Sequence, residues 1–129
     1  HQEALITLLL ALTDKFPQSG ITPAFEQAQK IVDILDSSYS KSYYNGVIYE
    51  RRAKYHLKQG GPGGPTAAHD WFVKAMESFT EALSVDVPKN QEAVLRWNSC
   101  ARILNSRPDI KADDSSGAEM LLDSFETPH

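Results

Sequence analysis

The sequence predicts an all-α fold built from antiparallel helical hairpins, and three observations support this prediction. Apolar residues recur at helical spacing through most of the chain. Prolines and glycines divide this pattern into segments of helical length. The chain has 129 residues, of which 41% are hydrophobic, enough to form a core without metals or disulfides. We therefore expect one domain over residues 1–129, with about six helices and no strands.

The charge balance argues against nucleic acid as a partner. The chain has 13 basic and 17 acidic side chains, a net charge of −4, whereas nonspecific nucleic-acid binding relies on clustered Lys and Arg. Residues 4–12 are apolar but far fewer than the ~20 residues that cross a bilayer, so we expect no membrane partner. The single cysteine, Cys100, is expected to be a buried thiol in a reducing, cytoplasmic compartment.

The first predicted helix runs from about Gln2 to Lys15 and ends at the segment FPQSG, residues 16–20. It is apolar on nearly every side, because it contains Leu5, Ile6, Leu8, Leu9, Leu10 and Leu12. Such a helix needs cover on more than one face. It either lies deep in this fold or contacts a second copy or another protein. Residues 2–15 are therefore the predicted surface for a homo-oligomer.

Two longer helices are predicted next. The second helix opens with Thr22 as its N-cap and Pro23 in its first turn, and it runs to about Ser38. The third helix extends from near Ser40 to the glycine-rich and proline-rich segment QGGPGGPT, residues 59–66. Its apolar residues occupy more than one face, so we expect it to lie between neighbouring helices. The segment after it is a surface loop, either a tolerated insertion or a functional lid.

The fourth predicted helix, from about Ala67 to Val85, has the clearest apolar stripe. The stripe is formed by Phe72, Ala75, Met76, Phe79, Ala82 and Leu83. The fifth helix runs from about Asn90 to Ser106. A polar loop over residues 109–116 then leads to a short sixth helix, which a capping box opens near residues 116–125.

The fourth predicted helix carries the spacing of a known repeat family. A small residue, an aromatic four positions later, an alanine three positions after that and a nearby proline are found at Ala75, Phe79, Ala82 and Pro88. This spacing resembles the second helix of a tetratricopeptide repeat. In such a helix, small residues let two antiparallel helices approach closely, and the aromatic ring fills the gap beside them.

The third predicted helix carries a matching pattern. An aromatic, a glycine and a tyrosine, which the family has in its first helix, are found at Tyr44, Gly46 and Tyr49. The segment RWNSCAR, residues 96–102, resembles a degenerate copy of this pattern. The resemblance covers about residues 40–106. It implies a short right-handed array of hairpins that binds a protein or peptide.

The sequence shows no catalytic or metal-binding constellation. Its histidines do not have the spacing of a zinc site; they are His1, His56, His69 and His129. The glycine-rich loop lacks the Lys-Ser/Thr pair of a phosphate-binding loop. We therefore expect a protein that is not an enzyme and that has no metal and no cofactor.

Basic and amide side chains on the third and fifth helices are the candidate binding residues. The segment YERRAKYHLK, residues 49–58, contains Arg51 and could bind an acidic peptide, a carboxylate or a phosphate. It could equally be a solvated basic face balanced by nearby acids. Asn98 and its counterpart Asn45 could face one groove and bind peptide backbone, or satisfy local groups. The predicted partner-binding residues on this concave face are Tyr43, Asn45, Arg51, Asn98 and Arg102.

These residues favour a non-catalytic module that binds a protein or peptide in a helical groove. Two alternatives belong to other classes. One is a small-molecule-binding or enzymatic domain, with a pocket around Trp97, Asn98, Arg102 and His56. The other is a structural domain that oligomerises through the leucine-rich first helix.

Overall fold

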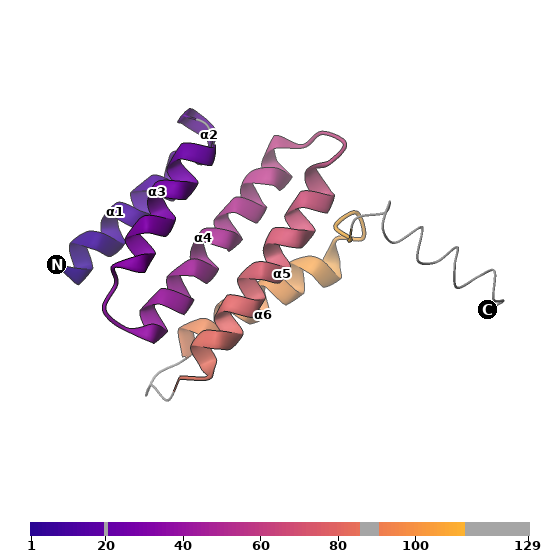
Figure 1. Cartoon of the computed structure of the whole chain (residues 1–129). Helices are drawn as coiled ribbons and strands as arrows, with labels where there is room; N and C mark the ends of the chain where they lie inside the picture. The colour runs from indigo at the N-terminus through magenta and orange to yellow at the C-terminus, as the bar shows by residue number, and fades with distance from the viewer. Residues whose placement is uncertain (20, 86–90, 113–129) are drawn as a thin grey trace, which may run out of the picture.

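The computed structural model describes residues 1–19, 21–85 and 91–112. In this part of the chain all regular structure is helical, with five longer helices and one four-residue helical turn (Figure 1). The bounds are α1 Gln2–Asp14, α2 Phe16–Ser19, α3 Ile21–Asp33, α4 Ser38–Gln59, α5 Gly64–Leu83 and α6 Gln91–Ser106. The all-α prediction is therefore confirmed. The helix predicted near residues 116–125 lies outside the described residues.

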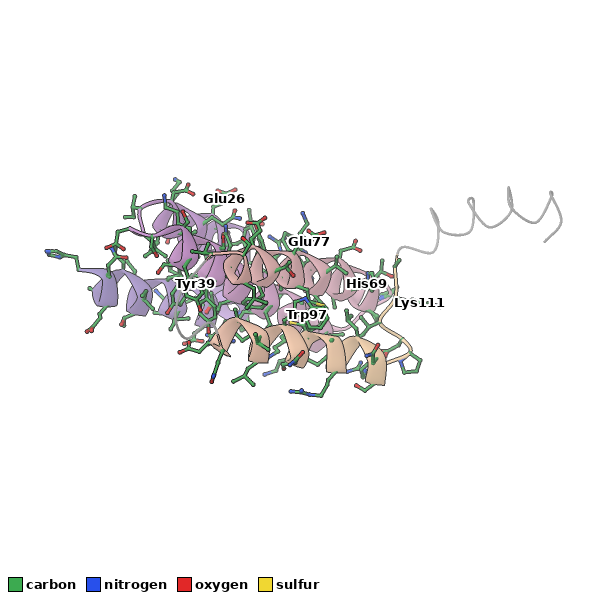
Figure 2. All side chains as sticks on the ribbon, turned by 90° about the horizontal axis from the view of Figure 1, so that it is seen from below. Glu26, Tyr39, His69, Glu77, Trp97 and Lys111 are labelled. Carbon is green, nitrogen blue, oxygen red and sulfur yellow. The ribbon has the colours of Figure 1, made fainter. Side chains whose placement is uncertain are left out.

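The helices stack as antiparallel hairpins, as predicted. Helix α1 packs against α3, α4 packs extensively against α5, and α6 packs on α5. Figure 1 shows α1, α4 and α6 running in one direction and α3 and α5 in the other. In Figure 2, Glu26 of α3 and Glu77 of α5 point outward from one face, and α6 lies on the opposite face. One side of the molecule thus combines helices that are not adjacent in sequence.

The start of α4 is fixed by a side-chain cap. The Ser37 hydroxyl accepts a hydrogen bond from the Ser40 backbone N–H at 3.0 Å, so the helix begins at Ser38, two residues before the predicted start. The preceding helix, α3, ends at Asp33 rather than near Ser38, and Leu35 is buried after it. The predicted N-cap Thr22 was wrong, because α3 begins one residue earlier.

The glycine-rich connection is shorter than predicted. Helix α5 begins at Gly64, so only residues 60–63 of the predicted loop join α4 to α5. Gly60 and Gly61 have φ angles of 73° and 84°, which side-chain-bearing residues rarely adopt. The proline in the first turn of α5 is tolerated because its missing N–H has no helical partner there.

The close packing of α4 on α5 centres on a glycine. A Cβ atom added to Gly46 would lie 2.4 Å from Cε1 of Phe79, so only a residue without a side chain fits there. The predicted stripe of α5 is buried at its centre, where Phe72, Ala75, Phe79 and Ala82 are fully enclosed. The expectation that small residues permit a close approach beside an aromatic ring is confirmed for this pair of helices.

Helix α1 is covered on one side. Leu9 and Leu12 are buried in a cluster with residues of α3, while Leu8 remains 51% exposed. Ala4 and Ala11 are also exposed, one turn before and one turn after Leu8. A narrow apolar strip therefore remains on the outer side of α1.

Candidate functional site

A groove along α4 is a concave feature that joins several helices of the described chain. Its volume is about 400 Å³. The end of α1 and the start of α2 form one wall, α4 forms the floor, and a side chain of α6 closes the far side. We call it the α4 groove, and its lining residues are Thr13, Asp14, Phe16, Pro17, Glu50, Arg51, Lys54, Tyr55, Lys58, Gln59 and Arg96.

The lining of the α4 groove combines positive charge with an apolar wall. It contains four basic side chains and two acidic ones, which leaves a net charge of +2. Pro17 and Tyr55 supply the accessible apolar surface, and the buried ring of Phe16 lies behind them. Ring packing holds this wall in place, since Phe16 and Tyr55 meet edge to face with centroids 6.4 Å apart. Such a surface suits a ligand that carries both acidic and apolar groups.

A buried carboxylate ties α6 to α4 within this groove. The side chain of Glu50 is only 3% exposed, and it pairs with Arg96 at 3.2 Å and with Lys54 at 3.0 Å. The Nε of Arg96 also donates a hydrogen bond to the Tyr43 hydroxyl at 2.7 Å. One guanidinium therefore bridges two acceptors of α4, and this fixes the position of α6 on the groove.

The pKa shifts within this bridge keep Arg96 charged and Tyr43 neutral. Burial lowers the pKa of Arg96, but the Tyr43 hydroxyl and the Glu50 carboxylate more than offset that effect, so the pKa lies above its usual value. Burial raises the pKa of Tyr43, although the hydrogen bond from Arg96 opposes the rise. Tyr43 therefore stays neutral and Arg96 stays charged at physiological pH.

On the opposite wall, Arg51 is held by the end of α1. Its Nη1 donates to the Thr13 hydroxyl at 2.9 Å and to the Asp14 carboxylate at 3.0 Å. The Thr13 hydroxyl in turn donates to the Leu10 carbonyl at 2.7 Å. Arg51 thus has a defined position before any ligand binds. Lys58, by contrast, is exposed and pairs with no acidic side chain among the described residues.

A second depression continues the groove toward the start of α4. Its volume is about 380 Å³, and it shares Glu50, Lys54 and Arg96 with the α4 groove. Its remaining lining residues are Tyr43, Glu92, Leu95 and Ser99. The two depressions together follow the boundary between α4 and α6, which makes the concave surface elongated rather than round.

The structure separates the five predicted binding residues. Arg51 lines the α4 groove, and Tyr43 lines its continuation. Asn45 precedes Glu50 by five positions, which places it about 140° away around the helix axis. Asn98 is exposed and lies about 160° from Arg96 around α6. The two asparagines therefore do not meet along this groove.

The remaining predicted residues lie elsewhere on the surface. Arg102 is exposed and lines a shallow depression whose other residues all belong to α6. Trp97 is half-buried against the core (Figure 2). His56 of α4 accepts a long hydrogen bond from Arg52 at 3.4 Å. Burial, and then the charge of Arg52, lower the pKa of His56.

The two arginines of the basic segment serve different faces. Arg51 lines the α4 groove, whereas Arg52 lies over two adjacent aromatic rings on another side of α4. The guanidinium carbon of Arg52 is 4.3 Å from the centroid of the Phe25 ring and 4.2 Å from that of Trp71. This cation–π contact fastens α3 and α5 to α4. The segment is therefore not a single solvated basic face.

Sequence reasoning missed Glu50 and Arg96 as groove residues, although their spacing carried a signal. Glu50 follows Gly46 by four positions, so it belongs to the buried side of α4. Arg96 lies between Ala93 and Cys100, both buried, at separations of three and four positions. A charged residue in a buried stripe requires an opposite charge nearby, and these two residues satisfy each other.

Other chemical features of the described residues are limited. No group of three or more His, Cys, Asp or Glu side chains among them could hold a metal ion. None of the helices in this part of the chain combines the length and the apolar character needed to cross a membrane. Cys100 is buried, and burial followed by the charge of Glu50 raises its pKa to about 12.

Comparison of the chain with protein-family models, with curated proteins and with solved structures finds no match. The functional interpretation therefore rests on the geometry of the α4 groove.

Proposed function

We propose that this protein is a non-catalytic interaction module that binds an acidic, partly apolar peptide segment of a partner protein in the α4 groove. The observation that supports this proposal most directly is the lining of the groove. Four basic side chains and an apolar wall line an elongated surface formed by several helices. Preformed grooves of this type bind peptides through a few apolar anchors and charge-assisted hydrogen bonds.

Different residues of the groove bind different groups of the peptide. Arg51, already held by Thr13 and Asp14, offers remaining donors to a carboxylate with little loss of side-chain entropy. Lys58 offers an ammonium group at the open end of the groove. Pro17 and Tyr55 offer apolar surface to an apolar side chain of the peptide. Glu50 forms ion pairs with Lys54 and Arg96 and holds these two side chains in position. It does not bind the ligand itself.

The arrangement of the helices also supports the proposal of a tetratricopeptide-like array. Helices α1, α4 and α6 run in the same direction and contribute to one concave side, as the first helices of successive hairpins do in that family. A buried thiol at Cys100 agrees with a cytoplasmic location, where cysteines remain reduced.

Fluorescence anisotropy with two synthetic peptides tests the proposed function. Both peptides carry the same leucine and phenylalanine residues; one has glutamates between them and the other has glutamines. We expect the full chain to bind the glutamate peptide, and Lys58→Glu to weaken that binding about tenfold or more. Lys41→Glu, an equal charge change at an exposed site outside the groove, serves as the matched control. Equal affinity of both peptides, or equal loss in both variants, would contradict the proposal.

A further inference from the structure

The charges of this protein are distributed unevenly along the chain. Residues 113–129, which we call the acidic tail, contain five acidic residues and no Lys or Arg. Because the whole chain has 17 acidic and 13 basic residues, residues 1–112 contain 12 acidic and 13 basic ones. The helical body is thus slightly basic, whereas the tail is strongly acidic. The acidic residues of the tail are Asp113, Asp114, Glu119, Asp123 and Glu126.

We propose that the acidic tail occupies the α4 groove of its own molecule and so competes with the partner peptide. This inference rests on the proposed function, because it assigns an internal ligand to the same site. It adds a regulatory element: the partner binds only when it displaces the tail.

The chemistry of the tail matches the groove. Its segment EMLLDSFE, residues 119–126, alternates acidic residues with Met, Leu and Phe. The groove offers the complementary surfaces, with Arg51, Lys54 and Lys58 around an apolar wall. The whole tail, with its five negative charges, is attracted to a lining of net charge +2. Contact between charges at the groove surface is also weakened by salt, which provides a test.

The path of the chain brings the tail to the correct end of the groove. Helices α4 and α6 run in the same direction, so α6 ends on the side of the molecule where α4 reaches Lys58 (Figure 1). Figure 2 shows Lys111 at the same end as His69, near the start of α5. The buried side chain of Ile110 anchors the chain at this point.

The length of the intervening segment is sufficient. The seven residues from Asp113 to Glu119 span up to about 25 Å when extended. Packed helices lie about 8–10 Å apart, so this reach crosses α6 and arrives at the groove. A short tether of this kind gives an effective concentration in the millimolar range. Even a weak contact between tail and groove is then populated within one molecule.

The outer face of α6 is the competing docking surface. Val94 is 41% exposed there, and Asn98 and Arg102 are exposed one and two turns later on the same face. Arg102 is the basic side chain of this face, whereas the α4 groove offers Arg51, Lys54 and Lys58 beside apolar surface. Charge therefore favours the α4 groove over the α6 face, and the two sites differ enough in position for an experiment to distinguish them.

A paramagnetic label on the tail locates its binding site in the full chain. The variant Ser124→Cys is labelled with a nitroxide, while Cys100 remains unlabelled because it is buried and its pKa is about 12. We expect the amide signals of Arg51, Tyr55 and Lys58 to broaden at low salt and to recover at high salt. Broadening confined to Val94, Asn98 and Arg102, or no broadening at all, would overturn the proposal.

A mixing experiment separates binding within one molecule from binding between two. Nitroxide-labelled chains without isotope are added to isotope-labelled chains without nitroxide, and the same amide signals are recorded. Binding within one molecule predicts no broadening in this mixture. Broadening of the groove signals in the mixture would assign the tail to a second copy and overturn the proposal as stated.

A competition assay tests regulation and separates its failure from that of the proposed function. All five acidic residues of the tail are changed to Asn or Gln, and binding of the glutamate peptide is measured by anisotropy. We expect this variant to bind the peptide about tenfold more tightly than the wild type. Equal affinity would refute the tail proposal alone. No binding to either chain would refute the proposed function as well.

A matched variant controls for the change in net charge. It neutralises five exposed acidic residues that lie outside the groove, namely Glu3, Glu26, Asp33, Asp36 and Glu77. We expect this control to bind the glutamate peptide with nearly the affinity of the wild type. A gain equal to that of the tail variant would show that overall charge, not the tail, controls access to the groove.

Discussion

At the scale of single residues, Gly46 shows most clearly how a missing side chain determines packing. The ring of Phe79 occupies the space that a Cβ atom would need, with three ring carbons 2.4–2.8 Å from its ideal position. The backbone of α4 therefore approaches α5 more closely there than any other residue type would allow. Because Phe79 is fully buried among neighbours, its ring has little room to move away.

The substitution Gly46→Ala tests this contact. We expect it to lower the free energy of unfolding by about 1–3 kcal/mol, because the added methyl group overpacks the interface. Urea unfolding followed by circular dichroism measures the change. Gly63→Ala is the matched control, since no atom lies within 4 Å of its added Cβ and its φ is −96°. Its effect should stay below about 1 kcal/mol, and equal losses in the two variants would contradict this account.

Cys100 gives the protein a defined response to alkaline pH. The pKa of its thiol is about 12 in the folded chain, against an ordinary value of 9.0. The unfolded chain therefore releases this proton first, and rising pH favours unfolding. The contribution of the protonated thiol to the free energy of unfolding is intact below about pH 9 and is lost between pH 9 and pH 12.

Urea unfolding at a series of pH values checks the role of Cys100. We expect wild-type stability to decline above pH 9, by up to about 1.4 kcal/mol per pH unit from this thiol. Cys100→Ala should show a shallower decline, while the tyrosines that also titrate at high pH stay the same in both chains. Parallel curves for the two proteins would contradict the assignment.

At the scale of elements, one side-chain bridge links α6 to α4, in addition to the packing of α6 on α5. Arg96 contacts both Tyr43 and Glu50, and Glu50 is the buried member of the ion pair. Removing the arginine leaves a buried carboxylate with Lys54 as its remaining partner. A stranded buried charge is costly, whereas loss of an exposed arginine elsewhere on the same helix costs little.

The pair Arg96→Ala and Arg102→Ala tests this difference within one helix. We expect Arg96→Ala to lower the free energy of unfolding by about 2–3 kcal/mol, and Arg102→Ala to change it by less than about 0.5 kcal/mol. Arg96→Lys should recover only part of the loss, because an ammonium group cannot span both acceptors as the guanidinium does. Thermal and urea unfolding measure the stability of all three variants. Similar losses for the two alanine variants would refute the bridge.

Local patterns predicted the helices themselves better than their ends. The stripe of α5 was correct because a single apolar face repeats over several turns of the helix. The start of α4 was placed two residues late, because several serines near Ser37 can act as the N-cap and only the hydrogen bond to Ser40 identifies the right one. Thr22 was a plausible cap, yet α3 begins before it.

The candidate site was harder to predict because it joins helices that are distant in sequence. Arg51 and Tyr43 were identified from local composition, and both line the concave surface. Asn98 and Arg102 stood out only as polar residues near Trp97, and both proved to be exposed on α6. The pair of Glu50 and Arg96 joins α4 to α6, two helices that are not adjacent in sequence, and no local pattern specifies it.

At the scale of the whole molecule, α1 leaves a predicted contact surface open. The prediction that residues 2–15 mediate a homo-oligomer stays a prediction, and the exposed strip around Leu8 is its most suitable surface. Light scattering at micromolar concentration should then give a mass at least twice the 14.4 kDa of one chain. Leu8→Lys should reduce the measured mass to that of one chain, and Gln27→Lys, at an exposed site of α3, should not. A single-chain mass for the wild type would contradict the prediction.

The order in which the helices pack along the chain also influences how the protein folds. Helices pack mainly against their neighbours in sequence. The most extensive packing is between α4 and α5, and only four residues connect these two helices. Closing so short a connection costs little chain entropy, and folds dominated by local contacts form quickly. We therefore expect the α4–α5 hairpin to form first, with α3 and α1 joining on one side and α6 on the other. Folding of this chain begins in the middle and proceeds outward toward both ends.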